Sequence, residues 1–211
     1  MKRNRFFHVL VLLIITLFPF INHAQTNFIK EEGKFVYVSS IGFAKGANDI
    51  LFENRNVQNN KSVISLHQVL AYKFNPYLLL GLGAGYDMWP KTGFIPIYAN
   101  FMVNFVDYKW SPFWYLNAGY SFKWYVNQKP EPMTRVIHGA KAGMFGETGL
   151  GLQLEMNPKF SLLFSVNYKL QQSYINYSVV ENDQPDLSQI STNRSAFALY
   201  HFIGFKLGFL F

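Results

Sequence analysis

Apolar residues alternate with small or polar residues along most of the chain beyond residue 34. The pattern is clearest in Phe113–Val126, where Trp114, Leu116, Ala118, Tyr120, Phe122, Trp124 and Val126 share one parity and Asn117, Gly119, Ser121 and Lys123 share the other. A period of two residues is typical of a β-strand with one apolar face. The same pattern, weaker in places, predicts eight strands, the seventh fraying above Leu170: Lys34–Phe43, Ser62–Phe74, Tyr77–Met88, Phe94–Val106, Phe113–Val126, Met144–Met156, Phe160–Tyr177 and Phe197–Phe211.

The connections between these strands alternate in length. Short turn signals at Asn75-Pro76, 107–112 and Asn157-Pro158-Lys159 separate the longer connections 44–61, 89–93, 127–142 and 178–194. A transmembrane barrel with both termini in the periplasm has its outer loops at odd connections and its short turns at even ones. All seven connections follow this order. The sequence therefore predicts an all-β fold, an eight-stranded antiparallel up-and-down transmembrane β-barrel in a bacterial outer membrane, with periplasmic N- and C-termini.

The first 24 residues have the pattern of a signal peptide. Basic residues at the start are followed by an apolar stretch, 6–21, and by Ala24 before Gln25. Removal of 24 of the 211 residues leaves 187, so we expect a signal peptide at 1–24 and one outer-membrane β-barrel domain at 25–211. An uncleaved anchor is the alternative, although the apolar stretch is shorter than the roughly 20 residues of a transmembrane helix.

Composition narrows the class of protein further. Hydrophobic residues make up 50% of the chain and aromatic residues 18%, while charged residues make up only 15%, against about 25% in soluble domains. No later segment approaches 18 uninterrupted apolar residues, which argues against a helical membrane protein. The chain has no cysteine, so disulfides, thiolate metal sites and a lipid-modified leader are excluded. The predicted mature chain has a net charge of +4 without a basic run, which does not indicate nucleic-acid binding.

Charged residues on the inward parity predict an ionic cluster inside the barrel. Lys123, Glu147 and Lys169 fall on three adjacent strands in the outer half, and Glu155 and Lys206 fall nearer the periplasm. Because buried charges persist only when paired, we expect Lys123, Glu147 and Lys169 to pair with one another as a structural plug. Eight strands leave a lumen that side chains can fill. A selectivity device or proton path is the alternative.

Inward glycines support a filled lumen. Gly81, Gly83, Gly85, Gly149 and Gly151 would leave room for large inward residues such as Tyr98, Tyr115 and Tyr125. No helix is expected after the repeated G-x-G, so the repeat does not indicate a nucleotide site.

Two tryptophans on one strand have the spacing of a membrane girdle. Trp114 and Trp124 are ten residues apart on the apolar face, which at ~3.3 Å per residue and a tilt of ~40° spans about 25 Å along the barrel axis. We expect them at the two membrane interfaces. The alternative is a pair of core tryptophans in a soluble sandwich.

Several motifs together resemble a known family. They are Leu80–Tyr86 (LGLGAGY), Phe94–Asn100 (FIPIYAN), Ser111–Phe113 leading into Asn117–Phe122 (NAGYSF), the leader ending Ala24-Gln25, and the terminal Phe211. The mature chain resembles the small outer-membrane β-barrel proteins of Bacteroidota, within the superfamily of the OmpA membrane domain and OmpX. The resemblance implies that Phe211 is the C-terminal signal for the barrel-assembly machinery. Such barrels serve as anchors, adhesins, lipid-modifying enzymes and secretion accessories.

The sequence predicts no catalytic, cofactor-binding or metal site. Lipid A deacylases of this architecture have a serine two residues after a histidine, and neither His67, His138 nor His201 has one. The acidic residues Glu181, Asp183 and Asp186 are expected in a solvated loop, with binding of calcium or of lipopolysaccharide-bound cations as the alternative.

The predicted outer loops are the remaining place for a function. The basic group Lys129, Arg135 and Lys141 suits lipopolysaccharide phosphates. We therefore expect no cofactor and a structural or interaction role through extracellular loops, with outer-membrane lipid, lipopolysaccharide and a surface or secretion partner as ligands. The alternatives are a lipid-modifying enzyme of the lipid A deacylase type, a narrow pore for small solutes, and a soluble barrel of the lipocalin type.

Overall fold

The computed structural model of the chain describes residues 34–52, 55–90, 92–126, 135–180 and 191–211. The predicted signal peptide, residues 1–24, lies outside the described residues. Within these ranges no helix is long and apolar enough to cross a membrane.

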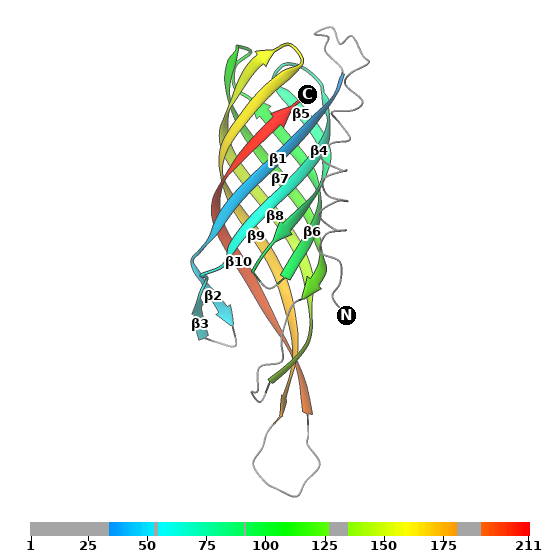
Figure 1. The fold of residues 1–211 in the computed structure, drawn as a ribbon, viewed down its shortest axis with the longest axis vertical. Helices are drawn as coiled ribbons and strands as arrows, with labels where there is room; N and C mark the ends of the chain where they lie inside the picture. The colour runs from blue at the N-terminus through cyan, green and yellow to red at the C-terminus, as the bar shows by residue number, and fades with distance from the viewer. Residues whose placement is uncertain (1–33, 53–54, 91, 127–134, 181–190) are drawn as a thin grey trace, which may run out of the picture.

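Eight long strands of the described chain form one closed antiparallel barrel (Figure 1). In chain order they are β1 (Lys34–Ala47), β4 (Ser62–Lys73), β5 (Leu78–Met88), β6 (Thr92–Asn104), β7 (Trp110–Val126), β8 (Arg135–Asn157), β9 (Phe160–Val180) and β10 (Ser191–Leu210). Each strand pairs with the next one along the chain, and β1 closes the barrel by pairing with β10. The predicted fold class is confirmed.

Short connections lie at one end of the barrel, together with both ends of the barrel chain. The segments 74–77, 105–109 and 158–159 connect strands there, and Tyr37 and Phe211 exchange two backbone hydrogen bonds of 2.9 Å. Asn75 holds the first turn, because its Oδ1 accepts hydrogen bonds from the backbone N–H groups of Tyr77 and Leu78. We call this the short-turn end, which is at the top of Figure 1, and the opposite one the long-loop end.

The connection predicted as the loop 44–61 contains additional strands. β1 continues to Ala47, and a hairpin of β2 (Asp49–Phe52) and β3 (Arg55–Gln58) follows. Asn48 joins the two elements with a φ of 64°, a left-handed conformation that asparagine adopts more readily than most residues. The hairpin projects beside the barrel at the long-loop end (Figure 1).

Strands β8, β9 and β10 extend further than their alternation predicted. They form a three-stranded ribbon beyond the barrel, whereas the ladder between β7 and β8 ends at Tyr120 and Met144 (Figure 1). The expected fraying of β9 above Leu170 was wrong, since β9 pairs with β10 up to Val180 and Ser191. Backbone hydrogen bonds on both sides of β9 hold the strand where its side-chain pattern weakens.

On the barrel strands, the alternate positions that carry apolar residues face outward. On β7, Leu116, Phe122 and Trp124 are exposed, while Tyr115 and Asn117 on the other parity are buried. Large apolar side chains are exposed in the same way on all eight barrel strands. The barrel therefore has an apolar outer surface and a lumen rich in polar groups, the reverse of a soluble barrel.

Candidate functional site in the barrel interior

The lumen toward the long-loop end is filled by an aromatic cluster, which we call the aromatic plug: Trp89, Phe94, Tyr200 and Phe202. The ring of Trp89 meets the other three edge-on, with centroid distances of 4.8–5.0 Å. Lys61 lies over the plug, with its Nζ 4.5 Å from the ring centroid of Tyr200 and 3.3 Å from its hydroxyl. These four buried rings therefore pack against one another inside the lumen.

A layer of buried polar side chains crosses the middle of the lumen. The polar layer consists of Ser65 and His67 on β4, Asp87 on β5, Tyr98 on β6, Tyr115 on β7, Glu147 on β8, Lys169 on β9 and Lys206 on β10. Seven of the eight barrel strands contribute to it, so the layer depends on closure of the whole barrel.

The first ion pair of the polar layer joins Asp87 and Lys169. The ammonium of Lys169 donates to Asp87 Oδ1 at 2.6 Å and to the hydroxyl of Ser65 at 3.0 Å. Ser65 in turn donates to the same carboxylate oxygen at 2.6 Å. Both charged side chains are at most 2% exposed, and burial of this kind requires the partners they have.

The second ion pair joins Glu147 and Lys206. Glu147 Oε1 accepts hydrogen bonds from Lys206 Nζ and, at 2.6 Å, from the hydroxyl of Tyr115. The two carboxylates and two ammonium groups balance in charge. One oxygen of each carboxylate, Asp87 Oδ2 and Glu147 Oε2, is buried without a hydrogen-bond partner among the described residues.

His67 links the two ion pairs. Its Nε2 is 3.1 Å from Asp87 Oδ1, and its Nδ1 is 3.0 Å from the hydroxyl of Tyr98 and 3.4 Å from Lys206 Nζ. A carboxylate only accepts hydrogen bonds and an ammonium only donates them. We therefore assign the neutral tautomer with its proton on Nε2, which donates to Asp87 while Nδ1 accepts.

Glycines make room for the rings of the polar layer. A Cβ at Gly83 would lie 2.4 Å from the ring of Tyr98, one at Gly85 2.3 Å from the imidazole of His67, and one at Gly149 2.6 Å from the ring of Tyr115. The expectation that inward glycines leave space for large residues is confirmed at Tyr98 and Tyr115. The side chain of Tyr125 lies outside the described residues.

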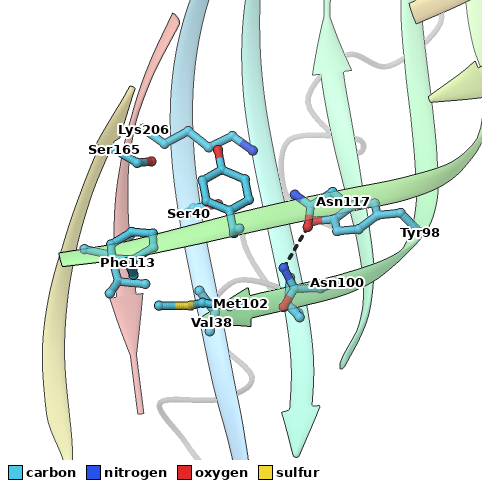
Figure 2. Close-up of a pocket in the computed structure, with 13 residues that line it drawn as sticks. Val38, Ser40, Tyr98, Asn100, Met102, Phe113, Asn117, Ser165 and Lys206 are labelled. Carbon is cyan, nitrogen blue, oxygen red and sulfur yellow. Dashed lines mark hydrogen bonds between the residues drawn. The ribbon is translucent and has the colours of Figure 1, made fainter. Parts of the chain in front are cut away.

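A cavity of about 50 Å³ lies between the polar layer and the short-turn end (Figure 2). Its lining includes the apolar side chains of Val38 and Met102, and Lys206 of the polar layer. Asn100 Nδ2 donates to Asn117 Oδ1 at 2.7 Å across its wall, as the dashed line in Figure 2 shows. The cavity has the volume of a few water molecules rather than that of a solute channel.

The charged residues of the predicted ionic cluster pair with other residues than expected. Glu147 and Lys169 face each other in the ladder between β8 and β9, but Glu147 pairs with Lys206 and Lys169 pairs with Asp87. Lys123 is half-buried, six residues beyond the position on β7 that faces Glu147, and takes no part in these pairs.

Glu155 and Lys206, the two charged residues expected nearer the periplasm, lie at different heights in the barrel. Lys206 lies in the polar layer itself, because β10 brings it level with Glu147. Glu155 is half-buried eight residues further along β8, toward the short-turn end. The alternation in the sequence puts Asp87 and His67 at inward positions, but it does not predict that Asp87 pairs with Lys169 or that His67 contacts both ion pairs.

The predicted girdle tryptophans both face outward. Trp124 is exposed on the part of β7 nearest the long-loop end. Trp114 is half-buried, and its Nε1 donates to Thr148 Oγ1 at 2.9 Å.

A ring of aromatic side chains surrounds the short-turn end, which we call the aromatic belt: Phe35, Tyr72, Phe74, Tyr77, Phe105, Tyr108, Trp110, Phe160, Phe209 and Phe211. The terminal Phe211 belongs to it, with its ring 5.5 Å from that of Phe160.

The histidines considered as catalytic candidates lie apart. His67 is in the polar layer, and His201 is on the outward face, where its Nδ1 meets the hydroxyl of Tyr168. The side chain of His138 lies outside the described residues. Among the described residues no group of three or more histidines and carboxylates is arranged to hold a metal ion.

The barrel is similar to solved outer-membrane proteins. OprG, an outer membrane protein from Pseudomonas aeruginosa, superposes with a TM-score of 0.50 at 12% sequence identity, covering 86% of this chain and 99% of that chain. AlkL, another outer membrane protein, gives a TM-score of 0.47 at 9% identity over 88% and 93% of the two chains. Neisserial surface protein A gives 0.44 at 11% identity over 83% and 98%. No protein-family model and no curated protein sequence matches the chain. The likeness to OprG shows that the two chains share a fold.

Proposed function

We propose that the protein is a small outer-membrane barrel with a closed lumen, which acts through its long-loop end and carries out no catalysis. The observation that carries this proposal is the inversion of polarity, with apolar side chains outside and ion pairs inside. An apolar outer wall with an aromatic belt suits a bilayer, where closed barrels satisfy every backbone group between strands. The shared fold with an outer membrane protein supports the location.

The difference between the two ends of the barrel supports an orientation with both termini in the periplasm. Outer-membrane barrels have short turns and chain termini on the periplasmic side and longer loops outside. We therefore place Lys34, Phe211 and the short turns in the periplasm. In this orientation Phe211, directly after β10, is available to the barrel-assembly machinery, and the ribbon of β8–β10 and the β2–β3 hairpin project to the cell exterior.

The filled lumen favours a structural or interaction role over transport. The aromatic plug and the polar layer follow one another along the axis, and each fills the lumen with buried side chains. Binding of lipopolysaccharide or a surface or secretion partner is therefore assigned to the loops, where barrels of this kind carry their function. In this proposal the chain belongs with the Bacteroidota barrels of the OmpA and OmpX type, which the sequence motifs support.

A narrow pore is the second candidate, and the cavity beneath the polar layer favours it. In a pore, opening would require both the plug and the ion pairs to move, since the cavity is below them. The lipid-modifying alternative has no comparable observation in its favour.

Planar-bilayer recording of the purified protein distinguishes the closed barrel from the pore. We expect no steady conductance from the parent protein, nor from Trp89→Ala combined with Phe202→Ala, because that variant removes two of the four rings of the plug but leaves the polar layer in place. Steady single-channel conductance of the parent would contradict the closed lumen and support the pore. Leu150→Ala, on the outer wall, is the control for loss of a large apolar residue.

A further inference from the structure

A polar pair interrupts the apolar outer wall on β1 and β4. Ser39 is at an outward position between Tyr37 and Ile41 but is only 8% exposed, and its hydroxyl donates to Gln68 Oε1 at 2.6 Å. Gln68 is the outward residue opposite Ser39 in the ladder, and Ala84 of β5 is opposite Gln68 on its other side.

This pair lies at the height of the bilayer interior. Gln68 is near the centre of β4, four residues from Tyr72 of the aromatic belt. At ~3.3 Å per residue and a strand tilt of ~40°, the carboxamide is about 10 Å above the belt. No water is available at that depth to complete its hydrogen bonds.

The carboxamide of Gln68 is only half satisfied. Ser39 engages the oxygen, and Nε2 has no hydrogen-bond partner among the described residues. Two other outward polar side chains each accept one hydrogen bond and donate another. Thr148 accepts from Trp114 Nε1 and donates to the carbonyl of Tyr115. Gln172 accepts from the N–H of Met144 and donates to the hydroxyl of Tyr174. An amide donor facing hydrocarbon without an acceptor is unfavourable.

We propose that the wall around Ser39, Gln68 and Ala84 is a dimer face that binds a second copy of this chain. A two-fold axis places the same group opposite itself. A carboxamide carries both a donor and an acceptor, so each Gln68 Nε2 donates to the carboxamide oxygen or the Ser39 hydroxyl of the other copy. Lipid tails offer no such acceptor. The small side chain of Ala84 lets the two walls approach, as small residues do at interfaces within membranes.

Single-cysteine cross-linking tests the face in a chain that has no cysteine of its own. Ala84→Cys lies on the proposed face, and Leu150→Cys is an outward position on β8, four strands from β4 in either direction around the barrel. Oxidation of each variant in lipid vesicles should give a disulfide-linked dimer with Ala84→Cys and at least tenfold less with Leu150→Cys. Equal yields at the two positions would show random collision and overturn the proposal.

Sedimentation equilibrium in density-matched micelles tests the role of the amide. Gln68→Leu should lower the dimer association constant about tenfold, because two reciprocal hydrogen bonds are lost. Thr148→Val, which removes an outward hydroxyl on the opposite wall, should leave it unchanged. Both variants should keep the heat-modifiable gel migration of a folded barrel.

The inference rests on the proposed membrane location, and these experiments distinguish failure of the dimer face from failure of the membrane location. A parent protein that needs detergent but stays monomeric at all concentrations, or a dimer that Gln68→Leu leaves intact, would overturn the dimer face alone. A parent protein that stays dissolved without detergent would overturn the membrane location itself.

Discussion

Loss of the charge on Glu147 should destabilise the barrel strongly. Glu147 Oε1 is the acceptor for both Lys206 and Tyr115, and the carboxylate is buried in the middle of the lumen. Glu147→Gln keeps an oxygen for Tyr115 but leaves the buried ammonium of Lys206 without its counter-charge. Removal of one partner of a buried ion pair costs about 3–5 kcal/mol. Since one hydrogen bond is retained, we expect the lower end, about 3 kcal/mol.

The measurement is the temperature at which the folded, faster-migrating form disappears from an unboiled gel in mild detergent. For a domain of this size 1 kcal/mol corresponds to roughly 2–4 °C, so we expect the midpoint to fall by about 6–12 °C. Lys206→Met in the Glu147→Gln background should recover part of the loss, because the unpaired charge is then absent.

The matched control is Lys123→Met, which removes a lysine of the same lumen that lies outside the two ion pairs. It should shift the midpoint by less than about 2 °C, as substitutions away from buried networks usually do. An unchanged midpoint in Glu147→Gln, or equal losses in Glu147→Gln and Lys123→Met, would refute the pairing described for the polar layer.

Three further changes test other parts of the structure. Gly83→Ala should reduce the yield of folded barrel, because its Cβ would lie 2.4 Å from the ring of Tyr98; Tyr98→Leu in the same chain should restore the yield on an unboiled gel. Trp89→Ala should destabilise the barrel by about 3–5 kcal/mol through the cavity it leaves, measured by urea unfolding followed by fluorescence, with Trp124→Ala as the exposed control. Deletion of residues 49–58 should leave heat-modifiable migration intact, since the β2–β3 hairpin pairs only with itself in the described sheets; loss of folding would show that the hairpin supports the barrel.

The barrel could be predicted from the sequence because its signals are local. Alternation along β7 and β10 marks which side chains face outward, and the turn residues at Asn75-Pro76 and Asn157-Pro158 mark where the chain reverses. Strand number and connection order then leave little choice of topology. The extra length of β8, β9 and β10 is not local, because it depends on pairing between strands.

The partners in the polar layer could not be predicted in the same way. Parity places Lys169 inside, but not opposite Asp87, which lies 82 residues away on a strand that is not its neighbour. Tilt and stagger of the strands decide which inward residues reach the same height. The expectation that Lys123 joins Glu147 assumed that adjacent strands align by counting from their turns, whereas the residue of β7 opposite Glu147 is Asn117.

The requirement that every buried charge has a counter-charge limits which inward residues can pair. Asp87 and His67 lie on the inward parity, and a buried carboxylate requires a cation. Pairing each of the inward carboxylates Asp87, Glu147 and Glu155 with a different inward lysine leads to separate ion pairs rather than a cluster of two lysines around one glutamate. The identity of the pairs still requires the register.

Gel migration of the mature chain, extracted from membranes in mild detergent and compared with and without boiling, tests the membrane barrel most directly. The closed barrel predicts two apparent sizes, with the compact form converting to the extended form only on heating. A single band from a protein that stays soluble without detergent would contradict an apolar wall in contact with lipid.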